Sequence, residues 1–206
     1  MDNDSIRRGK PATHIKFGEA SAVLAGNSLL TLAFEIIADK NYSIPSKQKN
    51  EIIKSLAYCS GHTGIAGGQE LDLKFEKKKK NLRQIINMQK KKTGKLFNFC
   101  LLAVGILAKK GAKEKKFLSI LGEEIGLLFQ LADDFLDIKG NKKLVGKPTN
   151  KDYKKGKSTL TKLMGYDKAH NYANNLKKKI LLKLKKHGKK GKDLSDTVEF
   201  ILGRNF

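Results

Sequence analysis

The sequence predicts an all-α protein, and its composition and its apolar spacing support that fold class. Only three prolines interrupt the 206 residues, and Val, Thr, Tyr and Trp are sparse beside Leu, Ile, Ala, Lys and Glu. Apolar residues recur at the i, i+3 and i+4 spacing that marks one face of a helix. The length suits one large domain with its own core, so we expect a single domain over residues 1–206.

Helical spacing recurs along the chain, and two of the segments are apolar around most of their circumference. The expected helices cover about 16–38, 46–66, 81–89, 94–110, 114–138, 159–164, 168–187 and 192–203. The two apolar segments are 16–38 and "FNFCLLAVGILA" at 97–108, and helices of this kind belong at the centre of a bundle. The Gly-, Lys- and Asn-rich segment 139–158 is expected to form a basic loop beside an acidic helix.

The net charge of +23 raises the question of a nucleic-acid partner. Of the basic residues, 39 are Lys and only four are Arg, whereas phosphate and base-edge readers favour the planar Arg fork. We therefore expect no nucleic-acid partner and read the Lys surplus as a solvated surface. The densest Lys runs, 74–84 and 177–192, are interpreted as exposed helix faces, with an anionic partner as the alternative.

The absence of targeting and metal-site patterns in the sequence predicts the cellular location and the state of the cysteines. We recognise no 18-residue apolar run and no signal peptide, which predicts a cytoplasmic protein without integral membrane association. Cys59 and Cys100 fall in apolar helical stretches without metal-ligand spacing, so both are expected to be buried free thiols. His14 and His62 also lack the spacing of a metal site.

The segment "FQLADDFLDI" at 129–138 places three aspartates on an otherwise hydrophobic helix. Carboxylates one turn apart can share Mg²⁺, which accepts one or two protein oxygens and fills its other positions with water and phosphate oxygens. Asp133, Asp134 and Asp137 are therefore candidate metal ligands. The alternative is a trio at a helix end that merely faces solvent.

The N-terminal segment carries a second acidic cluster followed by two arginines. In "MDNDSIRRGKPATH", Asp2 and Asp4 precede Arg7 and Arg8, whose forks can grip phosphate oxygens bidentately. Two acidic clusters together with fixed cations predict a pocket for a metal-bound diphosphate.

The chain resembles the trans-polyprenyl diphosphate synthases, and among them most closely the bacterial farnesyl diphosphate synthases (geranyltranstransferases). Seven segments carry the resemblance in order: residues 1–30, "GGQELDL" (67–73), "KKTGKLF" (91–97), "GLLFQLADDFLD" (126–137), "VGKPTNKD" (145–152), "GKSTL" (156–160) and "ILGRN". The resemblance implies an isoprenoid-synthase-type helical bundle, usually a homodimer. Its active site would be a central cavity between two aspartate-rich helices.

The resemblance also implies a role for each motif residue. Mg²⁺ would be held by Asp2, Asp133, Asp134 and Asp137. Arg7 matches the position that contacts the allylic diphosphate, and Arg8 the position that contacts isopentenyl diphosphate.

Further polar residues match positions around the same substrate. Lys92, Thr93 and Gln130 correspond to catalytic and substrate-binding positions, with a helix break at Gly94. Lys147 and Lys157 match lysines that close over the diphosphate. The family motif places Gln69 and Asp72 near the pocket, although Gly67–Gly68 could simply permit close helix packing.

The implied reaction condenses dimethylallyl or geranyl diphosphate with isopentenyl diphosphate to give farnesyl diphosphate. Geranyl and geranylgeranyl products stay open, because the residues that set product length precede the first motif. The resemblance places the leading aspartate pair and earlier helices before Met1, so we expect the isolated chain to be weakly active or inactive. The alternative is a non-catalytic prenyl-synthase-like subunit or truncated remnant that acts through dimerisation.

Overall fold

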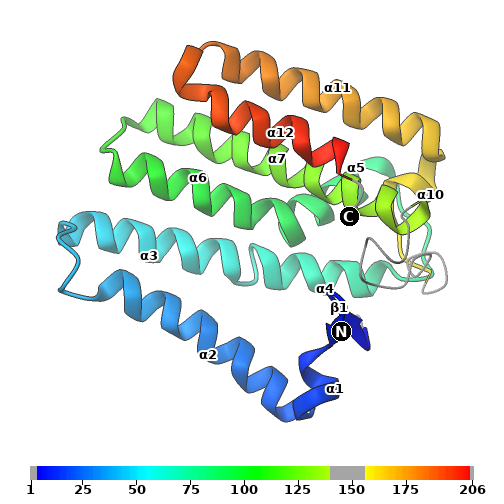
Figure 1. Cartoon of the computed structure of the whole chain (residues 1–206), viewed down its shortest axis with the longest axis horizontal. Helices are drawn as coiled ribbons and strands as arrows, with labels where there is room; N and C mark the ends of the chain where they lie inside the picture. The colour runs from blue at the N-terminus through cyan, green and yellow to red at the C-terminus, as the bar shows by residue number, and fades with distance from the viewer. Residues whose placement is uncertain (1–3, 140–155, 205–206) are drawn as a thin grey trace.

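Helices carry nearly all of the described chain and lie side by side in a stack, from α2 at one edge to α11 at the other (Figure 1). The computed structural model describes residues 4–139 and 156–204. The helices are α1 (Thr13–Phe17), α2 (Glu19–Ala38), α3 (Ser46–Ser60), α4 (Ile65–Phe75), α5 (Leu82–Gln89), α6 (Lys95–Leu107), α7 (Ala112–Lys139), α10 (Leu160–Met164), α11 (Tyr166–Lys185) and α12 (Lys192–Gly203). The all-α prediction is confirmed.

Two short helical segments and a small hairpin complete the described elements. A π-helical segment, Lys90–Gly94, joins α5 to α6, and a 3₁₀ segment, Gly188–Gly191, precedes α12. Strands β1 (Ile6–Arg7) and β2 (Lys10–Pro11) pair antiparallel, with Arg7 opposite Lys10. The turn residues Arg8 and Gly9 have φ values of 52° and 72°, the left-handed conformation that a tight two-residue hairpin requires.

Helix α7 is the central element of the hydrophobic core. Its residues Leu121, Ile125, Leu128 and Leu131 recur at helical spacing, and each is at most 2% exposed. Burying one such side chain contributes about 1.5–3 kcal/mol. These residues pack α7 against α6, α11 and α12, so the aspartate segment at its C-terminal end is held by the best-packed part of the protein.

Glycines allow three helical segments to approach at backbone distance. A Cβ atom on Gly68 of α4 would lie 2.1 Å from the backbone nitrogen of Lys92. A Cβ atom on Gly126 of α7 would lie 2.5 Å from the Cα of Gly94. The π-helical segment is therefore held between α4 and α7 by contacts that no larger residue permits.

The prediction that segment 16–38 lies at the centre of the bundle is wrong for α2. None of its residues is buried, and Leu24 and Leu29 are 64% and 68% exposed. Its main contacts are to α1 and α3, at the edge of the stack (Figure 1). The other apolar segment does lie between two helices, since α6 packs against both α3 and α7, although Val104 on it is 59% exposed.

Helix α2 also corrects the expectation that no segment is long and apolar enough to span a membrane. Its 20 residues contain an 18-residue window of mean hydropathy 1.6. Length and composition alone do not separate a membrane span from a helix that packs on another protein surface, so the helix carries no membrane assignment.

Other differences arise where glycines or exposed helix faces decide the structure. The helix expected over 46–66 ends at Ser60, and the chain then turns so tightly that a Cβ on Gly64 would lie 1.8 Å from the carbonyl oxygen of Cys59. Helix α4 then continues to Phe75, beyond the predicted end. Cys59 is buried, and this burial raises the pKa of its thiol, but Cys100 lies on the exposed side of α6 and corrects the second half of the thiol prediction.

Replacing Gly68 with Ala is expected to destabilise the fold by about 1–3 kcal/mol, because the new methyl group meets the backbone of Lys92. Gly26 in α2 is a matched control, since a Cβ there meets nothing within 4 Å. Gly26→Ala should be neutral or stabilise by up to about 1 kcal/mol. Urea unfolding measures both changes, and equal midpoints for the two variants would contradict the close-contact account.

Candidate active site

A small cavity of about 30 Å³ lies where α4, α5, α7 and the segment that begins at Gly156 meet. Six of its lining side chains carry a carboxylate, ammonium or amide group, and they come from these elements and from the π-helical segment Lys90–Gly94: Asp72, Gln89, Lys92, Gln130, Asp134 and Lys157. The cavity thus gathers two carboxylates, two ammonium groups and two amides. Five of these residues belong to motifs that the sequence analysis singled out, and the fold brings them together.

Asp72 organises the two lysines of the cavity. Its carboxylate is 4% exposed, and Oδ2 accepts a hydrogen bond from Nζ of Lys92 at 2.5 Å. The Nζ atom of Lys157 lies 4.0 Å from the same oxygen. One buried carboxylate therefore holds two ammonium groups near each other, where a multivalent anion could contact both.

Two amides and a hydroxyl orient the carboxylate of Asp134, which is 3% exposed. Nε2 of Gln89 donates to Oδ2 at 3.0 Å, and Nε2 of Gln130 donates to Oδ1 at 3.0 Å. The hydroxyl of Thr93 donates to Oε1 of Gln130 at 2.7 Å. Both carboxylate oxygens are thus fixed in direction by neutral donors.

The π-helical segment sets where Lys92 and Thr93 point. A π turn contains one more residue than an α turn, which shifts the following side chains around the helix axis. This widened turn replaces the helix break expected at Gly94. Because Gly68 and Gly94 bring α4 and α7 close to it, Lys92 reaches Asp72 of α4 while Thr93 reaches Gln130 of α7.

The three aspartates of α7 have different surroundings. Asp134 lines the cavity, and Asp137 is buried at 7% exposure. Asp133 forms an ion pair with Arg204, whose guanidinium carbon lies 4.1 Å from the centre of the Phe129 ring. Within residues 4–139 and 156–204, no group of three His, Cys, Asp or Glu side chains could hold a metal ion. Joint metal binding by these three aspartates therefore stays a prediction.

The donor chemistry of the cavity nevertheless fits a magnesium ion. Oε1 of Gln89 is buried without a hydrogen-bond partner, and the amide of the same side chain contacts Asp134. A carboxylate and an amide oxygen are hard ligands of the kind Mg²⁺ accepts, with its remaining positions left to water and phosphate. Asp134 and Gln89 are the described residues best placed to contribute.

The remaining predicted residues lie away from the cavity or outside the described chain. Arg7 and Arg8 are exposed on the β hairpin, and neither forms an ion pair with a carboxylate in residues 4–139 or 156–204. Asp2 and Lys147 fall outside the described residues.

Sequence reasoning assigned no role to two residues of the site, although Arg204 belongs to the quoted segment "ILGRN". Gln89 had no motif of its own, although it directly precedes the Lys-rich π segment. Arg204 lies 71 residues from Asp133 along the chain. The sequence did offer a signal for Arg204, because it is one of only four arginines in a chain with 39 lysines.

Comparison with known proteins gives a consistent result. The profile of the family described as polyprenyl synthetase matches residues 1–199. The farnesyl diphosphate synthase of Escherichia coli K12 is 37% identical over 212 residues, covering 100% of this chain and 70% of that protein. The farnesyl diphosphate synthase of Bacillus subtilis 168 is 35% identical over 170 residues, covering 82% of this chain and 57% of that protein.

A solved structure agrees with these sequence matches. The geranyltransferase of Helicobacter pylori, complexed with magnesium and isoprenyl diphosphate, superposes with a TM-score of 0.86 and 33% identity. The match covers 98% of this chain and 66% of that one. The chain thus spans between 57% and 70% of the length of these relatives. The resemblance found in the sequence is confirmed.

A double-mutant cycle tests whether Asp72 and Lys92 act as a coupled pair. Among the described residues, Lys92→Met leaves the buried carboxylate only Lys157 at 4.0 Å, so the Asp72→Asn and Lys92→Met changes should couple by about 1–3 kcal/mol in unfolding free energy. The control cycle uses Glu70 and Lys74, whose side chains are both 63% exposed and should couple weakly. Equal coupling in the two cycles would contradict the assignment.

Proposed function

Because the chain belongs to the polyprenyl synthetase family, we propose that it catalyses head-to-tail prenyl transfer, as a short-chain trans-prenyl diphosphate synthase. The substrates are dimethylallyl or geranyl diphosphate and isopentenyl diphosphate, and the product is farnesyl diphosphate. The observation that carries the proposal is the pair of lysines held by Asp72 beside the oriented carboxylate of Asp134. We also propose a cytoplasmic location for the protein.

The lysines bind the diphosphate of the allylic substrate. Lys92 and Lys157 both lie at the carboxylate of Asp72, with side chains that are 22% and 13% exposed. Ammonium groups fixed in this way need no reorganisation as negative charge grows on the leaving diphosphate. Asp72 acts through them as a positioning residue.

The aspartate side of the cavity completes the charge balance. Magnesium, held by Asp134 with Asp133, Asp137 and Asp2, would neutralise the leaving diphosphate when bound. The chain's own residues orient this side: Thr93 holds Gln130, and Gln130 and Gln89 hold Asp134. Once the allylic carbon–oxygen bond breaks, the alkene of isopentenyl diphosphate attacks the cation and a proton leaves. Apolar side chains of α6 would keep water from the cation.

The two arginines of the hairpin are proposed contacts for the two substrates. Arg7 would bind the allylic diphosphate and Arg8 isopentenyl diphosphate, and Lys147 would close over the allylic group. The tight turn at Arg8–Gly9 presents both guanidinium groups outside the bundle without a carboxylate partner in the described chain. Their planar forks suit bidentate phosphate contacts that Lys would not reproduce.

The non-catalytic alternative is disfavoured by the site itself. A remnant that acted only through dimerisation would need neither the buried Asp72–Lys92 pair nor the hydrogen-bond chain on Asp134. We further propose that full activity requires the leading aspartate pair that the resemblance places upstream of Asp2.

Incorporation of radiolabelled isopentenyl diphosphate, with geranyl diphosphate and Mg²⁺, tests the proposed reaction. The assay is run on the 206-residue chain and on the chain extended by any upstream reading frame of its gene. In whichever form is active, Lys92→Ala should lower kcat/KM by about 100-fold or more. Lys185→Ala is the control, because Lys185 is an exposed lysine at the end of α11, and it should leave the rate unchanged. If neither form incorporates isopentenyl diphosphate, or if Lys92→Ala and Lys185→Ala lower the rate equally, the proposal is refuted.

We infer that the protein is a homodimer built on α2. One face of this helix carries three exposed apolar side chains: Leu29, Leu32 and Ile36, at 68%, 45% and 48% exposure. Together they form a large exposed apolar surface. A second copy related by a two-fold axis would bury the same face on both chains.

Leu29→Glu combined with Ile36→Glu should therefore convert a dimer into a monomer, because two charges would enter the apolar contact. Sedimentation equilibrium measures the mass of each form. Leu182→Glu provides the control, since Leu182 on α11 is 66% exposed and lies outside this face. A wild-type monomer, or a double variant that keeps the dimer mass, contradicts the inference.

A further inference from the structure

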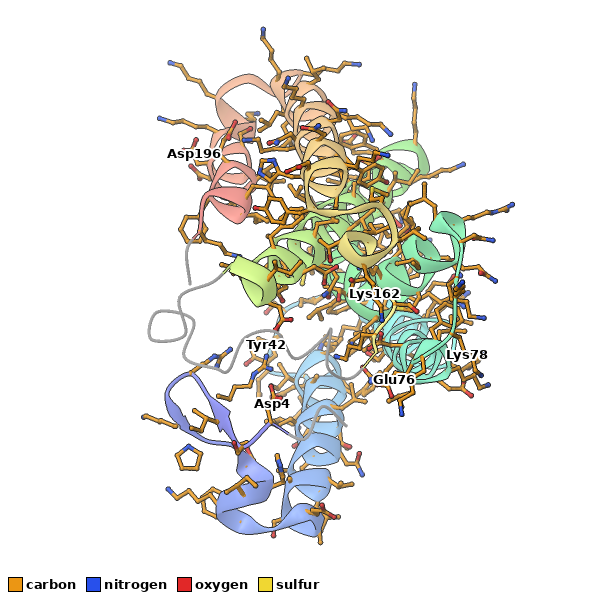
Figure 2. All side chains as sticks on the ribbon, turned by 90° about the vertical axis from the view of Figure 1, so that its right-hand side faces the viewer. Asp4, Tyr42, Glu76, Lys78, Lys162 and Asp196 are labelled. Carbon is orange, nitrogen blue, oxygen red and sulfur yellow. The ribbon has the colours of Figure 1, made fainter. Side chains whose placement is uncertain are left out.

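The lysine run at 77–80 has a different structure from the exposed helix face that its spacing predicts. Helix α4 ends at Phe75 and α5 begins at Leu82, so the four lysines form the connection between two helices. They line a pocket of about 490 Å³ together with Lys162 of α10. Figure 2 looks onto this end of the molecule, where Lys78 and Lys162 lie near that connection. The volume is within the range typical of small-molecule sites, about 300–1,000 Å³.

The connection is anchored by hydrogen bonds of its backbone. The N–H group of Lys77 donates to the carbonyl oxygen of Gly156 at 2.9 Å. The hydroxyl of Ser158 contacts the carbonyl oxygens of Phe75 and Lys78 at 2.9 and 3.0 Å. A capping box between Asn81 and Gln84 then starts α5. The lysine side chains therefore extend from an anchored backbone, so binding a ligand would order the side chains rather than the connection itself.

The described lining residues of this pocket carry charges of one sign only. No carboxylate is among its described lining residues. In the described parts of the chain, Lys77, Lys78 and Lys79 pair with no acidic group, and Lys80 lies over the ring of Phe75 at 4.6 Å. Like charges gathered in one concave surface repel one another, and a multivalent anion relieves that repulsion. Lysine ammonium groups are suited to phosphate as compact point charges.

The pocket also has an apolar part and a boundary with the candidate active site. Ile85 and Leu163 contribute apolar surface to it. Ser158 and Thr159 line both this pocket and the smaller cavity that contains Asp72 and Lys92. The two are neighbours that share a wall, but their lysines are different.

We propose that the pocket lined by Lys77–Lys80 and Lys162 is a second anion site, which binds a diphosphate or longer polyphosphate group. This inference goes beyond prenyl transfer and does not rest on it, because none of the five lysines belongs to the candidate active site. A bound anion would draw together the connection between α4 and α5 and the segment from Gly156 onward, both of which border the active-site cavity.

Calorimetric titration with inorganic diphosphate in metal-free buffer tests the proposal on the whole chain. The expected result is binding that weakens at least tenfold in the triple variant Lys77→Gln, Lys78→Gln, Lys79→Gln, measured on a Lys92→Gln, Lys157→Gln background that removes the active-site lysines. The matched control on that background replaces the exposed lysines Lys185, Lys186 and Lys189 with Gln, and should bind as the background does. Equal binding by the triple variant and its control would overturn the proposal.

Salt dependence and a second probe identify the ligand further. Binding should weaken steeply between about 50 and 200 mM salt, since exposed ammonium groups are screened over about one Debye length, and salt-insensitive binding would count against the site. Geranyl diphosphate is titrated in parallel: tighter binding than inorganic diphosphate assigns the site to a prenylated ligand that uses Ile85 and Leu163, and equal binding assigns it to free diphosphate.

The outcome is separable from that of the proposed reaction. The triple variant, made in the otherwise unchanged chain, should keep the incorporation rate, since its lysines touch no proposed substrate position. A chain that binds diphosphate at this pocket but incorporates no isopentenyl diphosphate would refute the proposed function and leave the second site standing.

Discussion

The close backbone contact between α4, the π-helical segment Lys90–Gly94 and α7 is the constraint on which the rest of the site depends. Gly68 and Gly126 allow contacts that a single Cβ atom would abolish. This contact places Lys92 within reach of Asp72 and Thr93 within reach of Gln130, although these partners are 20 and 37 residues apart along the chain. The polar cavity is therefore a consequence of how tightly three helical backbones pack.

Charge compensation explains how so many ionisable groups persist next to a hydrophobic core. Burying an unpaired carboxylate costs free energy, and the described aspartates of the site have different partners. Asp72 is paired with lysines, Asp133 with Arg204, and Asp134 is held by neutral amides. Because Asp134 also lines the cavity, we propose it as a carboxylate that faces the metal.

Local patterns predicted much of this fold because helix periodicity and helix ends are local properties. The aspartate helix and the apolar core positions of α7 could both be predicted from spacing and residue type. The exposure of α2 could not, because an apolar helix has the same pattern whether its partner belongs to its own chain or to another. The pairing of Asp133 with Arg204 and the pocket formed by Lys77–Lys80 depend on tertiary contacts between distant segments, which no short window contains.

The most direct test of the account is a crystal structure of the chain with geranyl diphosphate and Mg²⁺. The account predicts diphosphate oxygens in contact with Nζ of Lys92 and Lys157, a metal ion on the carboxylate of Asp134, and an unchanged contact between Gly68 and the π-helical segment. A diphosphate bound away from both lysines, with Asp134 free of metal, would contradict the central claim that this cavity is the site of prenyl transfer.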